Sequence, residues 1–208
     1  MILVNGDSWT GGPTYPNLED HWPYQLAKKY KLDVHNLAWG GASNQRIFRT
    51  TIEWLYQTDK LPSHLVIGWA LKERFELPSI KGLYCRITPN DGCENFIENN
   101  KPVPGIAKIK HYFYGYSYNE RLAQTAFEHN ILILQDLCKL KGIKLMMFNS
   151  RQEDDKLLEN PRIDETVWIL NPRESMANQL EKQFGQIKSG HTTVEGQHHW
   201  ADFVYNCM

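Results

Sequence analysis

Two residues far apart in the sequence, Ser8 and His191, have the types and surroundings that nucleophilic catalysis needs. Ser8 follows a short apolar run and stands at the mouth of a glycine-rich turn, in VNGDSWTGG. A serine hydroxyl is a weak nucleophile at neutral pH and needs a neighbouring base, which is most often histidine. Among the eight histidines, His191 lies in a glycine-marked stretch, SGHTTVEGQHHWADFV, just before a final apolar helix pattern. The pattern makes Ser8 a candidate nucleophile, with a helix cap as the alternative, and makes His191 the candidate for its general base.

The elements that must position these residues alternate between strands and helices. Helices are expected at Glu19–Tyr30, Asn44–Tyr56 with Ser43 as its cap, 119–141, Glu174–Phe184 and Val194–Tyr205, and strands at Ile2–Asn5, Asp33–Leu37, Leu65–Trp69, Ile143–Phe148 and Thr166–Leu170. This alternation predicts an α/β fold, a three-layer α/β/α sandwich with a central parallel sheet of the flavodoxin-like kind. We expect one domain over residues 1–208.

Three glycine-marked loops follow the first three expected strands. They are Gly6–Gly12, Gly40–Asn44 and the segment that starts at Gly68. Sites in parallel α/β sheets form where the carboxyl ends of the strands meet such loops. The strand and helix pattern then breaks over residues 72–118, which we interpret as a long insertion with a little structure of its own. Its aromatic cluster HYFYGYSY either packs the insertion or forms a wall of a substrate cleft.

Composition narrows the classes of partner. The chain has 208 residues and a formal net charge of −1, so no basic excess points to nucleic acid. No apolar run approaches the roughly 20 residues of a membrane span, and the first residues do not resemble a secretory signal. We therefore expect a cytoplasmic location, and a protein released by lysis or carried on a particle would look the same. The four cysteines match no zinc pattern; Cys85 and Cys93 are close enough to pair, but a reducing compartment favours free thiols.

Three stretches resemble the conserved blocks of one enzyme family. GDSW after the first strand, NLAWGGASN after the second and GHTTVEGQHHWA near the end resemble blocks of the SGNH (GDSL-type) hydrolases, in the family's order. The resemblance implies that Ser8 is the nucleophile and first oxyanion donor, that Gly41 N–H is the second donor, and that His191 is the base. The resemblance lies in both ends of the chain and in the order of the strands, and it covers roughly three fifths of the chain. The overall character also resembles SGNH-like proteins of tailed phages.

Two positions depart from this family pattern. Ala70 stands where the family has an asparagine that completes the oxyanion hole, and Lys188 and Ser189 stand where its acid precedes the histidine. One oxyanion donor is typically worth about 10²–10³ in rate. Asn44 could supply a replacement amide to the oxyanion hole, and Arg74 could supply charge.

Further candidates surround these blocks. Trp9, Trp69 and Arg74 are expected to contact substrate. Glu73 and Glu76 either replace the missing acid or form ordinary ion pairs with Lys72 or Arg74.

The same residues also have purely structural interpretations. Ser8 could cap a helix, Gly40 and Gly41 could serve only a tight turn, and His191 could be a solvated loop residue. Asp7 is expected to hold its loop through backbone N–H groups.

The sequence thus favours a cofactor-free and metal-free serine esterase that removes a small acyl group, such as acetate, from a carbohydrate or a related small ester. An acyl transferase would use the same residues. The alternative is a binding or virion-associated module on the same scaffold with decayed chemistry, because fold does not fix function. The sequence leaves the oligomeric state open.

Overall fold

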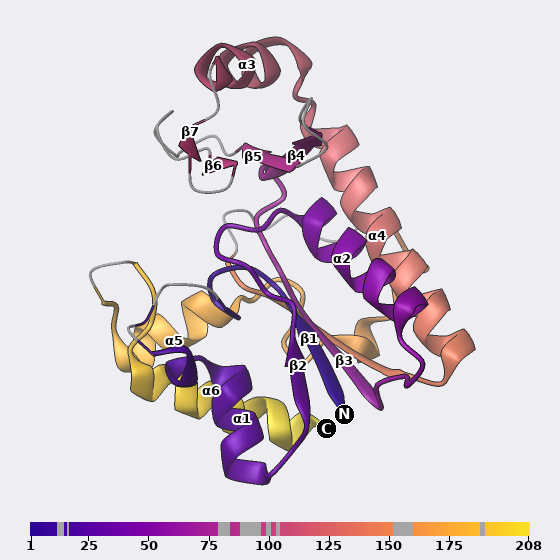
Figure 1. Ribbon diagram of the computed structural model, residues 1–208, viewed down its shortest axis with the longest axis vertical. Coiled ribbons are helices and arrows are strands. Elements are labelled where there is room, and N and C mark those ends of the chain that lie inside the picture. The colour runs from indigo at the N-terminus through magenta and orange to yellow at the C-terminus, as the bar shows by residue number, and fades with distance from the viewer. Residues whose placement is uncertain are drawn as a thin grey trace.

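The computed structural model describes residues 1–11, 15, 17–78, 84–87, 97–98, 101–102, 105–151, 160–187 and 190–208. Within these residues the central sheet has four strands in the order β2-β1-β3-β8. They are β1 (Ile2–Asn5), β2 (Val34–Asn36), β3 (His64–Trp69) and β8 (Lys144–Asn149). All neighbouring strands are parallel and therefore need crossover connections. Helices lie on both sides of the sheet in Figure 1, which confirms the three-layer α/β/α sandwich.

The strands are apolar because helices cover both faces of the sheet. All four residues of β1 are buried, and β3 is buried from Leu65 onward. Successive side chains of a strand point to opposite faces. Leu3 therefore belongs to one core cluster, whereas Ile2 and Val4 belong to the other.

One face of the sheet is covered by α2 (Asn44–Gln57) and α4 (Glu120–Lys141), which lie side by side in Figure 1. Ser43 caps α2 because its side chain accepts from the Arg46 N–H, as its cap position in the sequence predicts. Gly142, at a φ of 67°, ends α4 in the left-handed conformation that glycine tolerates best. The helix residues buried on this face include Ile47, Leu55, Ile131 and Leu134.

The other face is covered by α1 (Trp22–Tyr30), α5 (Met176–Phe184) and α6 (Val194–Cys207). Aromatic rings join these helices to the sheet. Phe148 of β8 lies 5.0 Å from the Trp200 ring and 6.1 Å from the Trp22 ring, both in edge-to-face arrangements.

Residues 72–118 include a lobe beyond the end of the sheet at which β3 finishes (Figure 1). Its described elements are β4 (Phe75–Pro78) paired with β5 (Tyr84–Ile87), β6 (Ile97–Glu98) paired with β7 (Lys101–Pro102), α3 (Ile106–Tyr112) and the π-helical turn η3 (Phe113–Ser117). The prediction of an insertion with a little structure of its own agrees with these elements.

Some rings of the aromatic cluster in the lobe are packed, and others are exposed. Phe113 and Tyr114 pack with the buried Ile87, and the Tyr114 hydroxyl donates to the Glu73 carbonyl at 2.6 Å. Tyr112 and Tyr116 are exposed instead. The cluster therefore packs the insertion through some of its rings and presents others to solvent.

Two predicted elements differ in the structure. The strand expected at 166–170 is a 3-10 turn, η4 (Glu165–Val167), followed by a single parallel bridge from Trp168 to Met147. The reason is local, since the Asp164 side chain accepts from the Thr166 N–H and starts a turn.

The first predicted helix is also divided. A separate 3-10 turn, η1 (Leu18–Asp20), precedes α1, because Pro23 is tolerated only in the first turn of a helix.

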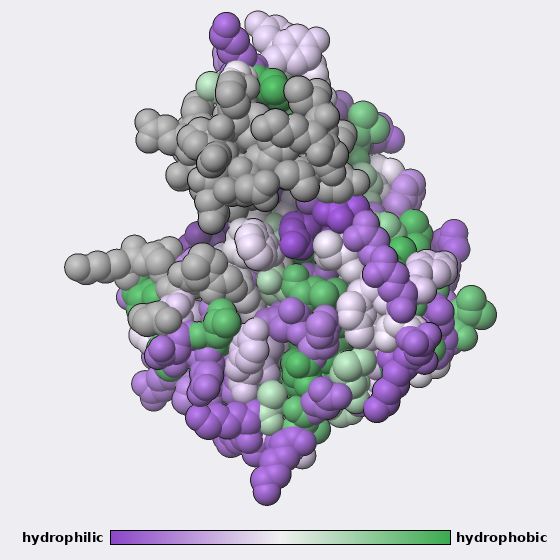
Figure 2. Space-filling view, viewed as in Figure 1, coloured by the Kyte–Doolittle hydropathy of each residue, from purple (hydrophilic) through white to green (hydrophobic). Residues whose placement is uncertain are grey.

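On the face drawn in Figure 2, hydrophilic side chains predominate over the lower part and hydrophobic ones form small groups. No helix among the described residues is long and apolar enough to cross a membrane. Cys138 and Cys207 are free thiols, and burial raises the pKa of Cys138 to about 12. The side chains of Cys85 and Cys93 are outside the described part of the structure, so whether they pair or stay free thiols remains a prediction.

Candidate active site

Ser8 lies in a tight turn directly after β1, at the carboxyl end of a central strand. The Asp7 carbonyl accepts hydrogen bonds from the N–H groups of Thr10 and Gly11 at 3.0 and 2.9 Å. The Asp7 carboxylate accepts a further bond from the Trp9 N–H at 3.1 Å. Asp7 therefore shapes the turn through backbone N–H groups and presents Ser8 at its apex, in agreement with its expected structural role.

Two glycines allow this turn to lie against the sheet. A Cβ on Gly6 would meet Thr10 Oγ1 at 2.5 Å, and a Cβ on Gly68 would meet the Phe148 ring at 2.7 Å. Both distances are below any normal carbon contact. The glycines of the first and third loops are therefore needed for close packing, in addition to any freedom of φ.

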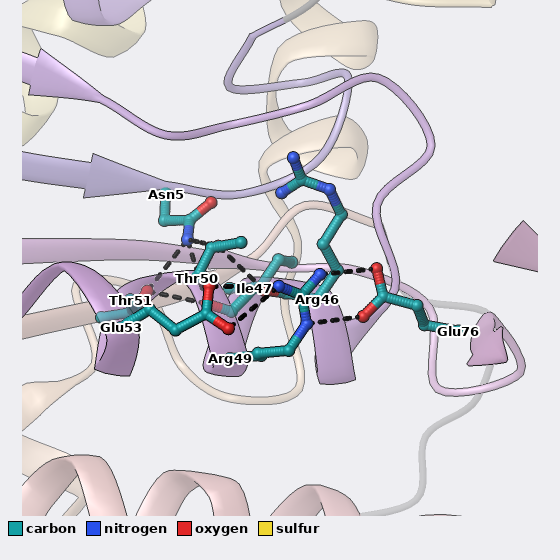
Figure 3. A network of polar contacts seen from close by, with 8 residues as sticks. All are labelled: Asn5, Arg46, Ile47, Arg49, Thr50, Thr51, Glu53 and Glu76. Atoms are coloured by element: carbon teal, nitrogen blue, oxygen red, sulfur yellow. Dashed lines mark hydrogen bonds and ion pairs between the residues drawn. The ribbon is translucent and has the colours of Figure 1, made fainter. Parts of the chain in front are cut away.

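A buried amide ties the end of β1 to α2. Asn5 Nδ2 lies 2.9 Å from the Ile47 carbonyl and from the hydroxyls of Thr50 and Thr51, as Figure 3 shows. Its Oδ1 accepts from the Gly6 N–H at 2.8 Å. A fully buried amide with this many partners holds one conformation, so Asn5, three positions before Ser8, is fixed.

His191 meets Ser8 across 183 residues of sequence. Its Nε2 atom lies 2.8 Å from Ser8 Oγ, within hydrogen-bond distance. The loop that carries it turns at Gly190, whose φ is 75°, and closes with a bond of 2.7 Å from the Ile187 N–H to the His191 carbonyl. This distance suits a nucleophile and its general base. Lys188 and Ser189, where the family acid would stand, lie outside the described residues.

Tyr15 anchors the histidine loop to the serine loop, and sequence analysis missed it. Its hydroxyl donates to the Thr192 carbonyl, next to His191, at 2.8 Å. Only 5% of Tyr15 is exposed, and burial raises its pKa to about 12, which keeps the phenol neutral and able to donate. A tyrosine in a Gly/Pro-rich loop carries no signal for such a contact, because the acceptor belongs to a distant segment.

Trp9 packs against His191 and is almost fully buried. Its ring centroid lies 5.0 Å from that of His191, and the Arg151 guanidinium lies 5.9 Å from the indole centroid. Only 2% of Trp9 is exposed. We predicted that Trp9 contacts substrate. In the structure its ring is buried and supports the histidine ring instead.

The loop after β2 lies against the Ser8 turn. The Trp39 N–H donates to the Gly6 carbonyl at 3.1 Å, and the Ala42 N–H closes a turn on the Trp39 carbonyl at 2.9 Å. Gly41 occupies this turn with a φ of 73°, a conformation that side chains disfavour. The tight-turn and oxyanion interpretations of Gly41 are compatible, because the turn brings its loop beside Ser8.

Asn44 connects α2 to the end of β3. Its Oδ1 accepts from the Ala70 N–H at 2.8 Å, and its Nδ2 donates to the Ala70 carbonyl at 3.0 Å. The side chain is buried, and these bonds occupy its oxygen and one of its two N–H bonds. Asn44 thus holds the residue that replaces the family asparagine.

Arg74 and Trp69, both predicted to contact substrate, have other partners. Arg74 Nη1 lies 2.7 Å from Asp7 Oδ2, and Asp7 is fully buried. Trp69 is fully buried in the core, with its Nε1–H on Met147 Sδ at 3.2 Å. The prediction for Trp69 is wrong because its strand is covered on both faces. Arg74 lies beside the serine turn with one guanidinium nitrogen committed to Asp7.

Glu76 forms its ion pair with a residue of helix α2. Its carboxylate binds Arg49 of α2, with a closest distance of 3.0 Å, rather than the predicted Lys72 or Arg74. Lys72 pairs with Glu120 at 3.2 Å. Among the described residues, no group of three or more His, Cys, Asp or Glu side chains could hold a metal ion.

In the comparisons with known proteins, the chain matches solved structures but no family model and no curated sequence. No protein-family model matches the chain. No curated protein matches it in sequence.

Several solved structures match nearly the whole chain. Esterase EstA from Pseudoalteromonas sp., in a structure inhibited by monoethylphosphonate, is 13% identical, with a TM-score of 0.55, and covers 99% of this chain and 94% of its own. A lipolytic protein of the G-D-S-L family from Desulfitobacterium hafniense DCB-2 is 12% identical, with a TM-score of 0.55 and coverage of 100% and 98%. The acetyl xylan esterase AlAXEase is 11% identical, with a TM-score of 0.55 and coverage of 100% of both chains. At these identities the likeness establishes the fold, and the chain has the three-layer α/β/α fold of the SGNH (GDSL-type) hydrolases.

Proposed function

We propose that this protein is a serine esterase of the SGNH type that hydrolyses a small acyl ester through an acyl-enzyme. The observation that carries the proposal is the distance of 2.8 Å between Ser8 Oγ and His191 Nε2 at the end of the sheet. The shared fold of an esterase and an acetyl xylan esterase supports it. Acetate on a carbohydrate is the substrate class that we favour.

In the first half-reaction Ser8 Oγ attacks the ester carbonyl carbon while His191 Nε2 takes its proton. The tetrahedral intermediate collapses as its C–O bond to the alcohol breaks, and His191 returns the proton to the leaving alcohol. In the second half-reaction water attacks the acyl-serine with His191 again as base, which releases the acid and restores Ser8. Atoms and charge balance with no cofactor.

The oxyanion would be bound by backbone N–H groups. We assign the donors to Ser8 N–H and Gly41 N–H, because the Gly41 loop is bonded to Gly6 and adjoins the serine turn. The Arg74 guanidinium, held on the buried Asp7, places positive charge beside the same turn. Asn44 is assigned a positioning role through Ala70 rather than that of a third donor.

A fluorophosphonate probe tests this proposal, because it bonds covalently only to an activated serine. We expect one adduct per chain by intact mass, and we expect its loss in both Ser8→Ala and His191→Ala. Ser63→Ala is a matched control, since Ser63 Oγ also lies 3.0 Å from a histidine nitrogen, His64 Nδ1, but on the exposed opposite end of β3. The control must label like wild type.

Failure of the folded wild-type protein to label would overturn the esterase proposal. The alternative, a binding module whose chemistry has decayed at Ala70 and at the positions before His191, would then be preferred. Labelling followed by hydrolysis of acetylated sugars over long-chain esters would support the favoured substrate class. The cytoplasmic location and the resemblance to phage proteins stay predictions.

A further inference from the structure

An exposed tryptophan stands on the loop that adjoins the serine turn. Trp39 is 61% exposed, although its backbone N–H is bonded to the Gly6 carbonyl. It immediately precedes Gly40 and Gly41. The exposed indole offers a flat apolar face on a loop whose backbone is held beside the serine turn, close to the proposed reaction centre.

A guanidinium group lies over this indole, and one of its nitrogen atoms is buried without a hydrogen-bond acceptor among the described residues. Arg46, in the first turn of α2, has its guanidinium carbon 5.6 Å from the centroid of the Trp39 ring. Its Nη1 atom is buried and has no hydrogen-bond partner within the described part of the chain. Burial lowers the pKa of the Arg46 guanidinium. Figure 3 shows this guanidinium extending away from the ion pair of Arg49 and Glu76, with no dashed line reaching it.

The neighbouring arginines differ from Arg46. Arg49, one helical turn further, binds Glu76 with a closest distance of 3.0 Å, and Arg74 binds Asp7 at 2.7 Å. Taking a cation out of water without hydrogen-bonded anionic partners is unfavourable. These two nearby carboxylates are already committed to other arginines. The stacking on Trp39 compensates only in part, so among the described residues Arg46 lacks an anionic hydrogen-bond partner.

We propose that Trp39 and Arg46 form a substrate subsite for an anionic carbohydrate ester, in which a sugar ring stacks on the indole and its carboxylate binds the guanidinium. A planar guanidinium matches a carboxylate in two parallel hydrogen bonds. This inference rests on the proposed esterase function and narrows its substrate to the ester of an acidic sugar.

The test compares two substrates that differ only at one carbon. Methyl mono-O-acetyl-galacturonoside carries a carboxylate where methyl mono-O-acetyl-galactoside carries a hydroxymethyl group. We expect wild-type kcat/KM to favour the acidic substrate by about 10- to 100-fold, the range for a charge-assisted hydrogen-bond pair. In Arg46→Gln this preference should fall to nearly one, and added salt should weaken it in wild type.

Three further variants separate the roles of the Arg46 charge, its planar guanidinium and the Trp39 ring. Arg49→Gln is the matched control, because it removes a guanidinium from the same helix that is already paired, and it should keep the wild-type preference. Arg46→Lys keeps the charge without the planar fork and should keep only part of it. Trp39→Ala should lower kcat/KM for both sugar esters. Far-ultraviolet circular dichroism and Tm establish that each variant is folded.

The outcomes distinguish this inference from the esterase proposal. A wild type that labels with fluorophosphonate but shows no preference for the acidic ester would overturn the subsite and leave the esterase intact. If labelling fails, binding of unacetylated methyl galacturonoside to wild type and Arg46→Gln, measured by calorimetry, still decides the subsite. Equal binding by both proteins would overturn it. A stronger preference for a galactose 6-phosphate ester would overturn the carboxylate assignment in favour of phosphate.

Discussion

At the scale of single residues, the Ser8–His191 pair depends on contacts that each hold one member in place. Asp7 shapes the serine turn and binds Arg74, while Trp9 packs on the imidazole and Tyr15 holds the carbonyl that follows it. The contacts come from loops, which are the most adaptable part of an α/β fold. A few buried polar groups therefore hold the serine loop and the histidine loop in fixed positions.

Tyr15→Phe tests the anchor of the histidine loop. It leaves the Thr192 carbonyl without its donor, and we expect a loss of about 1–2 kcal/mol in the free energy of unfolding at neutral pH. The pKa of Tyr15 is raised by burial to about 12, so its contribution is complete below pH 10 and is lost as pH rises toward 12. The stability difference between wild type and Tyr15→Phe, from urea titrations at pH 8, 10 and 11, should therefore shrink with rising pH. A difference independent of pH would contradict this role.

At the scale of elements, the site forms where β1, the β2–α2 loop and β3 end together. Asn5 joins β1 to α2, and Asn44 joins α2 to the residue after β3. Both amides bond to backbone groups just beyond the ends of strands, since Asn5 accepts from the Gly6 N–H after β1 and Asn44 bonds both backbone groups of Ala70 after β3. α2 is thus a scaffold that sets the spacing of the three loops.

Asn44→Ala tests this connection. It removes both bonds to Ala70, and we expect unfolding free energy to fall by about 2–4 kcal/mol, since two backbone groups lose their partners. Asn171→Ala is the control, because that side chain accepts one bond, from the Arg173 N–H, on the exposed surface. It should cost well below about 1 kcal/mol. Equal losses in both variants, measured by urea unfolding, would refute the assigned role.

At the scale of the whole molecule, the sheet is shared by two separate apolar clusters. Leu134 lies in the cluster on the α2–α4 face and Leu180 in the cluster on the other face, and both are fully buried. Because each cluster packs on the same strands, neither layer can unfold without exposing the sheet. The described sandwich should therefore unfold as one cooperative unit.

Leu134→Ala and Leu180→Ala test this cooperativity. Each substitution should cost about 2–5 kcal/mol through lost burial and a residual cavity. The double variant should lose about the sum, because the two sites lie on opposite faces of the sheet. Tryptophan fluorescence and circular dichroism should report the same midpoint in urea. Two separated transitions would show that the layers fold independently.

Local patterns in the sequence predicted the four central strands and the main helices in their order, the parallel α/β class and the three loops at the carboxyl ends of the first three strands, but not the 3-10 turns η1 and η4. The predicted features follow from local patterns, since apolar runs, caps and glycines act over a few residues. The sequence also singled out Ser8 and His191, because their flanking glycines and the strand before Ser8 are local features. Only the tertiary structure decided which side chains are available at the site. Trp69 is buried and Trp39 is exposed, Asn44 is bonded to Ala70, and Arg46 has no acceptor among the described residues while Arg49 is paired. Burial and pairing depend on segments that are distant in sequence, and their contacts form only when the layers pack.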